Sequence, residues 1–292
     1  MLEKGLVDKQ ARGMEVSSPH SHYSRPKGLF VFPFIVIAFM MIFGSAKAIK
    51  AVEKTFPFCP GEKLTFQIRW SFIPAGEVVL EIPPIESVNG VKSYHFVMIA
   101  KTYPLIDLIY RIRDRVDAYT DIEMTRSILY KKQNKGKGKR DVIVNFNWEK
   151  QEAQYSNFGR KTKPIAILPG SFDPFSIFYA FRLHDLKENA EVEAPVTDGK
   201  KCVVGKAKVI KREKIRVASG TYDTYLVEPD LKHIGGVFKK TKDAKIRIWV
   251  TADTKRIPVK VESRVVVGSF VGELISAEGI GRNDVRPTVI SK

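Results

Sequence analysis

A period-two alternation of apolar and polar residues begins at residue 64, and it constrains the fold of this chain more than any other feature. One face of the segment is formed by Leu64, Phe66, Ile68, Trp70 and Phe72, with polar residues between them. Successive side chains of a strand point to opposite faces of a sheet, so the alternation predicts a strand with one buried face. The pattern recurs along the chain and predicts roughly ten strands.

Turn signals between the alternating segments predict antiparallel pairing. Asn89-Gly90 and Asp198-Gly199 each separate two such segments. A type I′ hairpin turn needs positive φ at both central residues, which these residue types tolerate. No composition break or Gly/Ser-rich linker divides residues 49–282. We therefore expect one mainly β domain there, followed by a disordered tail at residues 283–292.

One segment of the domain, Asp173–Leu186, has the periodicity of a helix. Asp173 suits the N-cap and Pro174 the first helical position. Five aromatic residues gather in or just before the segment, namely Phe172, Phe175, Phe178, Tyr179 and Phe181. We predict a curved antiparallel sheet or incomplete barrel covered by this one aromatic-rich helix, whose rings either complete the core or form a lid over a ligand pocket. Leu105–Ile112 is compatible with a short second helix or a strand.

The N-terminal part of the chain has the three regions of a signal peptide. Basic residues precede an apolar run, Leu29–Phe43, which holds no charged or polar side chain, and small residues follow at Ala46 and Ala48. We expect residues 1–48 to be a signal peptide cleaved after Ala48 or, if uncleaved, an inner-membrane anchor. The run is shorter than the roughly 20 apolar residues of a spanning helix, which favours cleavage. Both alternatives place the domain in the periplasm or cell envelope.

The chain is strongly basic, with a net charge of +17. In an exported protein this excess argues against nucleic acid and leaves anionic lipid headgroups or acidic envelope polymers as partners, with plain solubility as the alternative. Basic residues concentrate around a polar loop that joins Ser127–Lys132 to Val142–Trp148. The candidate contacts for an anionic surface are Lys131, Lys132, Lys135, Lys137, Lys139 and Arg140. A solvated, mobile loop is the alternative.

Signatures of known enzyme classes are missing from the sequence. It has no nucleophile elbow, no His-Glu-x-x-His motif, no Cys-x-x-Cys pair and no phosphate-binding glycine loop. We therefore predict no catalytic residue, metal site or cofactor. The carboxylates that remain as crude candidates for an assembled acid–base pair are Glu62, Asp173, Asp223 and Asp253. The two cysteines, Cys59 and Cys202, either form one disulfide or remain separate thiols.

A longer pattern extends over much of the domain. Its segments are Phe58–Trp70, Ala75-Gly76-Glu77, Asp173–Arg182, Gly220–Thr224, Ile248–Asp253, Arg256–Val259, Gly268-Ser269 and Glu273-Leu274. Together they resemble the DUF3108 family, a set of bacterial exported proteins of unknown function, over about residues 56–280. The resemblance implies an exported, β-rich fold. It implies no activity and assigns no functional residue.

Two functions from different classes are compatible with these features. The first is a non-catalytic binding or assembly factor of the cell envelope, whose curved sheet encloses an apolar or lipid-like ligand. The second is an envelope hydrolase or polysaccharide-processing enzyme, which requires two carboxyls about 5–9.5 Å apart in one cleft if it acts on glycosides. The missing enzyme motifs favour the first, although the sequence identifies no ligand-binding residue.

Overall fold

A computed structural model describes residues 55–136, 138–231, 244–265 and 268–281. All of them belong to one compact unit, Lys54–Lys292, whereas the other unit, Met1–Glu53, lies outside the described residues. The predicted leader at residues 1–48 and the predicted tail at residues 283–292 therefore fall outside as well. No helix in the described part of the chain is long and apolar enough to cross a membrane.

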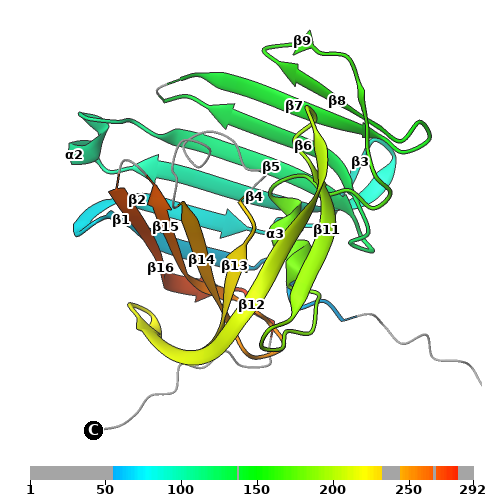
Figure 1. The fold of residues 1–292 in the computed structure, drawn as a ribbon. Helices are drawn as coiled ribbons and strands as arrows, with labels where there is room; N and C mark the ends of the chain where they lie inside the picture. The colour runs from blue at the N-terminus through cyan, green and yellow to red at the C-terminus, as the bar shows by residue number, and fades with distance from the viewer. Residues whose placement is uncertain (1–54, 137, 232–243, 266–267, 282–292) are drawn as a thin grey trace, which may run out of the picture. The chain divides into compact units, whose positions relative to one another are not determined.

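The described residues form one large antiparallel sheet (Figure 1). Its strands are β1 (Lys63–Trp70), β2 (Ile73–Glu81), β3 (Glu86–Val88), β4 (Val91–Thr102), β5 (Arg113–Asp121), β6 (Ser127–Asn134), β7 (Arg140–Asn147), β8 (Glu152–Asn157), β9 (Arg160–Lys161), β10 (Ile165–Ala166), β11 (Glu191–Thr197), β12 (Cys202–Val217), β13 (Gly220–Pro229), β14 (Lys245–Thr251), β15 (Pro258–Val265) and β16 (Gly268–Glu278). Two short helices are present in this part, α2 (Pro104–Asp107) and α3 (Ser176–Phe181).

The strand order joins the first and last strands of the chain and ends at β10 on one side and β11 on the other. It runs β10-β8-β7-β6-β5-β4-β2-β1-β16-β15-β14-β13-β12-β11, with β3 added to β4 and β9 to β8. Each hairpin continues the sheet, and β16 returns to pair with β1. Among the described residues β10 and β11 do not pair with each other, so the sheet does not close into a barrel. The predicted curved, mainly β fold is confirmed at this level.

The two predicted tight turns are present. Asn89 and Gly90 have φ of 52° and 79° and connect β3 to β4, as a type I′ turn requires. Gly199, with φ of 79°, lies in the turn between β11 and β12. A Cβ atom there would come within 2.9 Å of the Val144 side chain and 3.1 Å of Tyr155, so only glycine fits. The β11–β12 turn therefore packs against β7 and β8, which shows how strongly the sheet curls.

The predicted covering helix over Asp173–Leu186 is wrong in length. α3 has only six residues, and i→i−3 bonds continue beyond it, including Arg182 N–H to Tyr179 O at 3.1 Å and Leu183 N–H to Ala180 O at 3.0 Å. These tighter turns bring Arg182 inward to a buried carboxylate instead of extending the helix. The two short helices cannot cover a sheet of this size, and most of the core is formed between strands.

Side chains of the segment around α3 reach three separate hydrophobic clusters. Tyr179 is buried with Phe58, Phe96 and other residues of β4–β8, and Phe175 packs against this cluster and against the cluster of β1, β2 and β13–β16. Leu186 belongs to a third cluster with Val209 and Val227. The segment therefore lies inside the curve of the sheet, where Figure 1 shows α3 behind β11 and β12.

Candidate functional site

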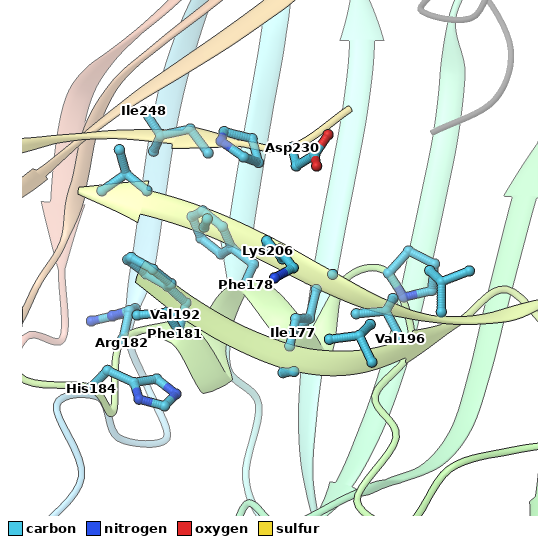
Figure 2. Close-up of a pocket in the computed structure, with 18 of the residues that line it drawn as sticks. Ile177, Phe178, Phe181, Arg182, His184, Val192, Val196, Lys206, Asp230 and Ile248 are labelled. Carbon is cyan, nitrogen blue, oxygen red and sulfur yellow. The ribbon is translucent and has the colours of Figure 1, made fainter. Parts of the chain in front are cut away.

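A cavity of about 610 Å³ lies between α3 and the strands β11–β14 (Figure 2). Most side chains that line it are aliphatic or aromatic. Small-molecule sites in proteins are usually apolar cavities of about 300–1,000 Å³ with a few polar groups. The cavity therefore has the size and the chemistry of a site for an apolar ligand.

The floor of the cavity is an apolar ladder of paired residues on β11 and β12. Val192 lies opposite Ala207, Ala194 opposite Gly205, and Val196 opposite Val203. Residues directly opposite in antiparallel strands have neighbouring side chains, so the Ala194/Gly205 pair contributes almost no volume at the centre of the ladder. The small side chains of this pair explain why space remains next to α3.

The α3 side of the cavity is formed by Ile177, Phe178 and Phe181, which are half-buried. Figure 2 shows these three side chains together with Val192 and Val196 around the cavity. Tyr179, in contrast, is only 1% exposed and stacks on Phe96 with a centroid distance of 3.9 Å. Tyr179 is therefore core, whereas Phe178 borders the cavity and also packs against the two largest hydrophobic clusters.

Polar groups contribute a small part of the lining. Lys206 pairs with Glu191 and Glu193, and the Asp198 carboxylate accepts the backbone N–H of Lys201 at 3.1 Å. His184 is the imidazole of the site, and burial lowers its pKa, as does nearby Arg256. These polar groups lie among a lining that is mostly apolar.

A buried ion pair anchors the end of α3 beside the cavity. Arg182 donates to both carboxylate oxygens of Glu62 at 2.5 and 2.9 Å, and the two residues are 1% and 2% exposed. The same guanidinium donates to Pro57 O at 3.1 Å and to Lys255 O at 3.0 Å. The pair thus joins the segment before β1, the end of α3 and the turn between β14 and β15.

Asp173 is also buried, and it binds the backbone of the turn before α3. Its carboxylate accepts the backbone N–H of Phe175 at 2.8 Å and of Ser176 at 2.9 Å, and the Ser127 hydroxyl donates to it at 2.6 Å. Burial raises the pKa of Asp173, although these hydrogen bonds oppose the shift. The N-cap of α3 is Phe175, without a side-chain bond, so Asp173 lies in the turn before the helix and not at the predicted N-cap position, and its carboxylate serves the local fold there.

The other two candidate carboxylates, Asp223 and Asp253, also have hydrogen-bond partners within the fold. Asp223 pairs with Arg212 at 2.5 Å, and the hydrogen bonds from Arg212 lower its pKa. Asp253 accepts the Thr251 hydroxyl at 2.6 Å and the backbone N–H of Lys255 at 3.0 Å, and so forms the β14–β15 turn. Each of the four carboxylates thus has its own structural partners, and none of these contacts joins two of them.

Both cysteines are free thiols. The Cys59 sulfur lies 3.5 Å from Gly279 O, whereas the Cys202 sulfur lies 3.4 Å from the Ser171 hydroxyl and 3.5 Å from Leu168 N. The two sulfurs therefore contact different parts of the domain and form no Cys59–Cys202 disulfide in this structure.

The basic residues proposed for an anionic surface do not share one loop. β6 extends to Asn134, so Lys131 and Lys132 lie within a strand, and Lys131 lies 5.9 Å from the centroid of the Tyr119 ring. Lys135 and Lys139 are exposed in the short β6–β7 turn, Arg140 begins β7, and Lys137 lies outside the described residues. The long loop predicted over residues 133–140 is therefore a shorter turn between Asn134 and Arg140.

Sequence analysis missed a charged network on β4 and β5. The two ring nitrogens of His95 lie 2.9 Å from Asp117 and 2.9 Å from Glu86, and Arg115 donates to Asp117 at 2.7 and 2.8 Å. Burial raises the pKa of Asp117, but the bonds from His95 and Arg115 outweigh it and lower the pKa to about 2. Within the described residues no group of three or more His, Cys, Asp and Glu could hold a metal ion.

The cavity residues of β11 were also missed. Val192, Ala194 and Val196 alternate with Glu191, Glu193 and Pro195, so the period-two signal is present in the sequence. That signal predicts a strand with one apolar face. It does not reveal that the face borders an empty space instead of a packed core.

Comparison with known proteins gives a family and a set of distant structures. A family model described as "Protein of unknown function (DUF3108)" matches residues 65–275. A crystal structure of a beta-barrel-like DUF1849 protein from Brucella abortus is similar at 10% identity and a TM-score of 0.48, over 75% of this chain and 97% of that one. No curated protein matches the chain.

Two further solved structures show a weaker similarity. A candidate lipoprotein from Parabacteroides distasonis has 11% identity and a TM-score of 0.31, and a candidate exported protein with a YmcC-like fold from Bacteroides fragilis has 7% identity and a TM-score of 0.29. Each match covers 76% of this chain and 97% of the other.

Proposed function

This chain belongs to the DUF3108 family, described as proteins of unknown function, and from that premise we propose that it is a non-catalytic binding or assembly factor of the cell envelope. Its ligand is an apolar, lipid-like molecule that occupies the cavity between α3 and β11–β14. The observation that carries the proposal is the cavity itself, about 610 Å³ in volume and lined mostly by apolar side chains.

The arrangement of the site supports binding more than catalysis. The aromatic side of α3 faces the ladder centred on Ala194 and Gly205, which offers a long apolar ligand contacts on two sides. Its borders are held by buried groups, since Arg182 is fixed by Glu62 and the turn before α3 is fixed by Asp173. A site with fixed borders loses little entropy when a ligand enters.

The cellular part of the proposal rests on the N-terminal sequence. The apolar run Leu29–Phe43 followed by Ala46 and Ala48 supports export to the periplasm or cell envelope. An apolar cavity has an obvious use in that compartment, where lipids must cross water between membranes. The hydrolase alternative gains no support, because Glu62, Asp173 and the other carboxylates have structural partners.

The experiment is a binding measurement with the chain that begins at Ile49, which contains the whole compact unit Lys54–Lys292. Native mass spectrometry of the purified protein identifies any lipid that co-purifies, and displacement of a fluorescent fatty acid measures the affinity. We expect Ala194→Phe, which fills the centre of the cavity, to weaken binding at least about tenfold.

The matched control is Lys208→Phe. Lys208 lies on β12 three residues beyond Gly205, is exposed and does not line the cavity. The Lys208→Phe substitution adds the same aromatic ring to the same hairpin, and the affinity for the fluorescent fatty acid should stay unchanged. Absence of both lipid and fatty-acid binding in the unsubstituted protein, or equal affinities for the two variants, contradicts the proposal.

A further inference from the structure

Six large apolar side chains are exposed on two loops of the sheet. In the β1–β2 turn and the start of β2, Phe72 is 95% and Ile73 is 51% exposed. In the β4–β5 connection the exposed fractions are 69% for Leu105, 84% for Leu108, 65% for Ile109 and 48% for Tyr110. Single exposed apolar residues are ordinary, but a contiguous group marks a binding surface.

The two loops are neighbours at one end of the sheet. Gly76 of β2 pairs with Thr102 of β4, and Tyr103 N–H donates to Ala75 O at 3.0 Å. The β1–β2 turn and α2 therefore extend from adjacent strands in the same direction, as Figure 1 also shows. We call the six side chains of these loops the apolar tip.

Polar contacts order the β4–β5 loop. Its leucines are therefore exposed on a folded loop. Asp107 accepts two bonds from Arg113, at 3.0 and 2.5 Å, and a third from the Thr102 hydroxyl. Ile106 is buried, and its carbonyl accepts Ile109 N–H at 2.9 Å and Tyr110 N–H at 2.8 Å. The fold therefore holds Leu105 and Leu108 outward in a defined position.

Basic residues lie on the side of the apolar tip that faces the β6–β7 turn. The β6–β7 turn contacts the loop directly, since Lys135 N–H donates to Arg113 O at 2.9 Å and Gly136 lies against the Arg111 carbonyl. This contact places exposed Lys135 beside exposed Arg111, and exposed Lys139 lies in the same turn. The one carboxylate of the loop, Asp107, is already paired with Arg113. The tip and its border thus combine apolar side chains with positive charge.

We infer that the apolar tip docks the domain on an anionic lipid bilayer. Leu105, Leu108 and Phe72 enter the interfacial layer, and Arg111, Lys135 and Lys139 contact the lipid phosphates. Interfacial binding of proteins depends on this combination of buried apolar area and attraction to anionic lipids. The inference concerns a different surface from the cavity and does not depend on the proposed ligand.

A bilayer fits the tip better than a protein partner does. The exposed residues lie on the ends of separate loops and not along a groove, so a soft surface can receive each of them. Lysine and arginine are the residues expected around side chains that enter an anionic interface, whereas lysine is depleted in the cores of protein interfaces. The charge of the border therefore selects a bilayer with anionic headgroups.

Vesicle flotation tests the inference with the chain that begins at Ile49, which lacks the apolar run Leu29–Phe43. We expect binding to phosphatidylcholine vesicles that contain phosphatidylglycerol, and weaker binding at high salt. Leu105→Ser/Leu108→Ser should lower the partition coefficient at least about tenfold. Lys135→Glu/Lys139→Glu should lower it about 25-fold or more on anionic vesicles, because each basic residue contributes about fivefold.

Two controls make the result specific. Ile275→Ser removes an apolar residue that is 38% exposed on β16, and Ala194→Phe fills the cavity; both should bind vesicles like the unsubstituted protein. In addition, Leu108→Trp should give a blue-shifted emission with vesicles, whereas Ile275→Trp should not.

Either of two results overturns the inference. One is that the unsubstituted protein does not bind vesicles, or that Leu105→Ser/Leu108→Ser and Ile275→Ser bind them equally well. Circular dichroism must confirm that both variants are folded. The other is a stable dimer that the double substitution disrupts in sedimentation without any vesicle binding, which identifies the tip as a protein interface.

Discussion

The two sides of α3 meet the same sheet, yet one side is packed and the other is hollow. Toward β4–β6, Tyr179 stacks on Phe96, and Ala118 lies between Phe96 and Tyr130 on the neighbouring strands. Toward β11 and β12, Ala194 lies opposite Gly205, and a cavity of about 610 Å³ remains. Alanine occupies both places, so the size of its cross-strand neighbours decides whether space is filled.

The comparison shows how one open sheet provides both a core and a site. Rings on β4 and β6 fill the packed side and contribute stability through burial. On the hollow side, the small residues of β11 and β12 bury less apolar surface and contribute less stability. The buried Glu62–Arg182 pair keeps the end of α3 between the two sides, because it also binds the β14–β15 turn.

The largest effect is expected from Glu62→Gln, which tests whether α3 is held by this pair. The substitution keeps the shape of the side chain but leaves the Arg182 charge buried without its partner. We expect the free energy of unfolding to fall by about 3–5 kcal/mol, measured by urea denaturation. Glu81→Gln, which breaks the partly exposed pair with Lys63, is the control, and its free energy of unfolding should stay within about 0.5 kcal/mol of the unsubstituted value. Similar losses in the two variants would show that the buried pair has no special role.

A smaller effect should separate the two faces of α3. Tyr179→Leu removes a ring that is 1% exposed, and we expect the free energy of unfolding to fall by roughly 2–3 kcal/mol. Phe178→Leu changes a half-buried ring beside the cavity. Its loss of unfolding free energy should stay below about 1 kcal/mol, while the amount of retained ligand should change. Thermal melting together with lipid content measures both outcomes. A larger loss for Phe178→Leu than for Tyr179→Leu would reverse the assignment of packed and hollow sides.

The smallest effect compares the two alanines. Ala118→Leu forces extra volume between Phe96 and Tyr130 and should cost about 1–3 kcal/mol. Ala194→Leu adds the same volume to the cavity and should change the free energy of unfolding by about 0.5 kcal/mol or less. The difference, read from paired urea titrations, measures how empty the cavity is. Equal costs at the two positions would mean that the Ala194 side is packed as well.

Local features of the sequence predicted several strands and two of the turns, although roughly ten strands were expected and the described residues form sixteen. The alternation from Leu64 predicts β1, and Asn89-Gly90 predicts the turn before β4, because both depend on residues close together in the chain. The turn that Asp173 forms before α3 is local too, although the helix itself begins later than predicted. The length of α3 was not predictable in this way, because its end depends on Arg182 meeting Glu62, 120 residues away.

By itself, the sequence determined a mainly β domain in the DUF3108 family, since period-two patterns and turn residues act over a few positions. Only the tertiary structure decided that α3 stays short, that the four candidate carboxylates have separate structural partners, and that the Ala194 side is hollow. It also decided that the loop carrying Leu105 and Leu108 contacts the β6–β7 turn. Each of these depends on which distant strands become neighbours, and pairing across an open sheet is a property of the whole chain that no local pattern contains.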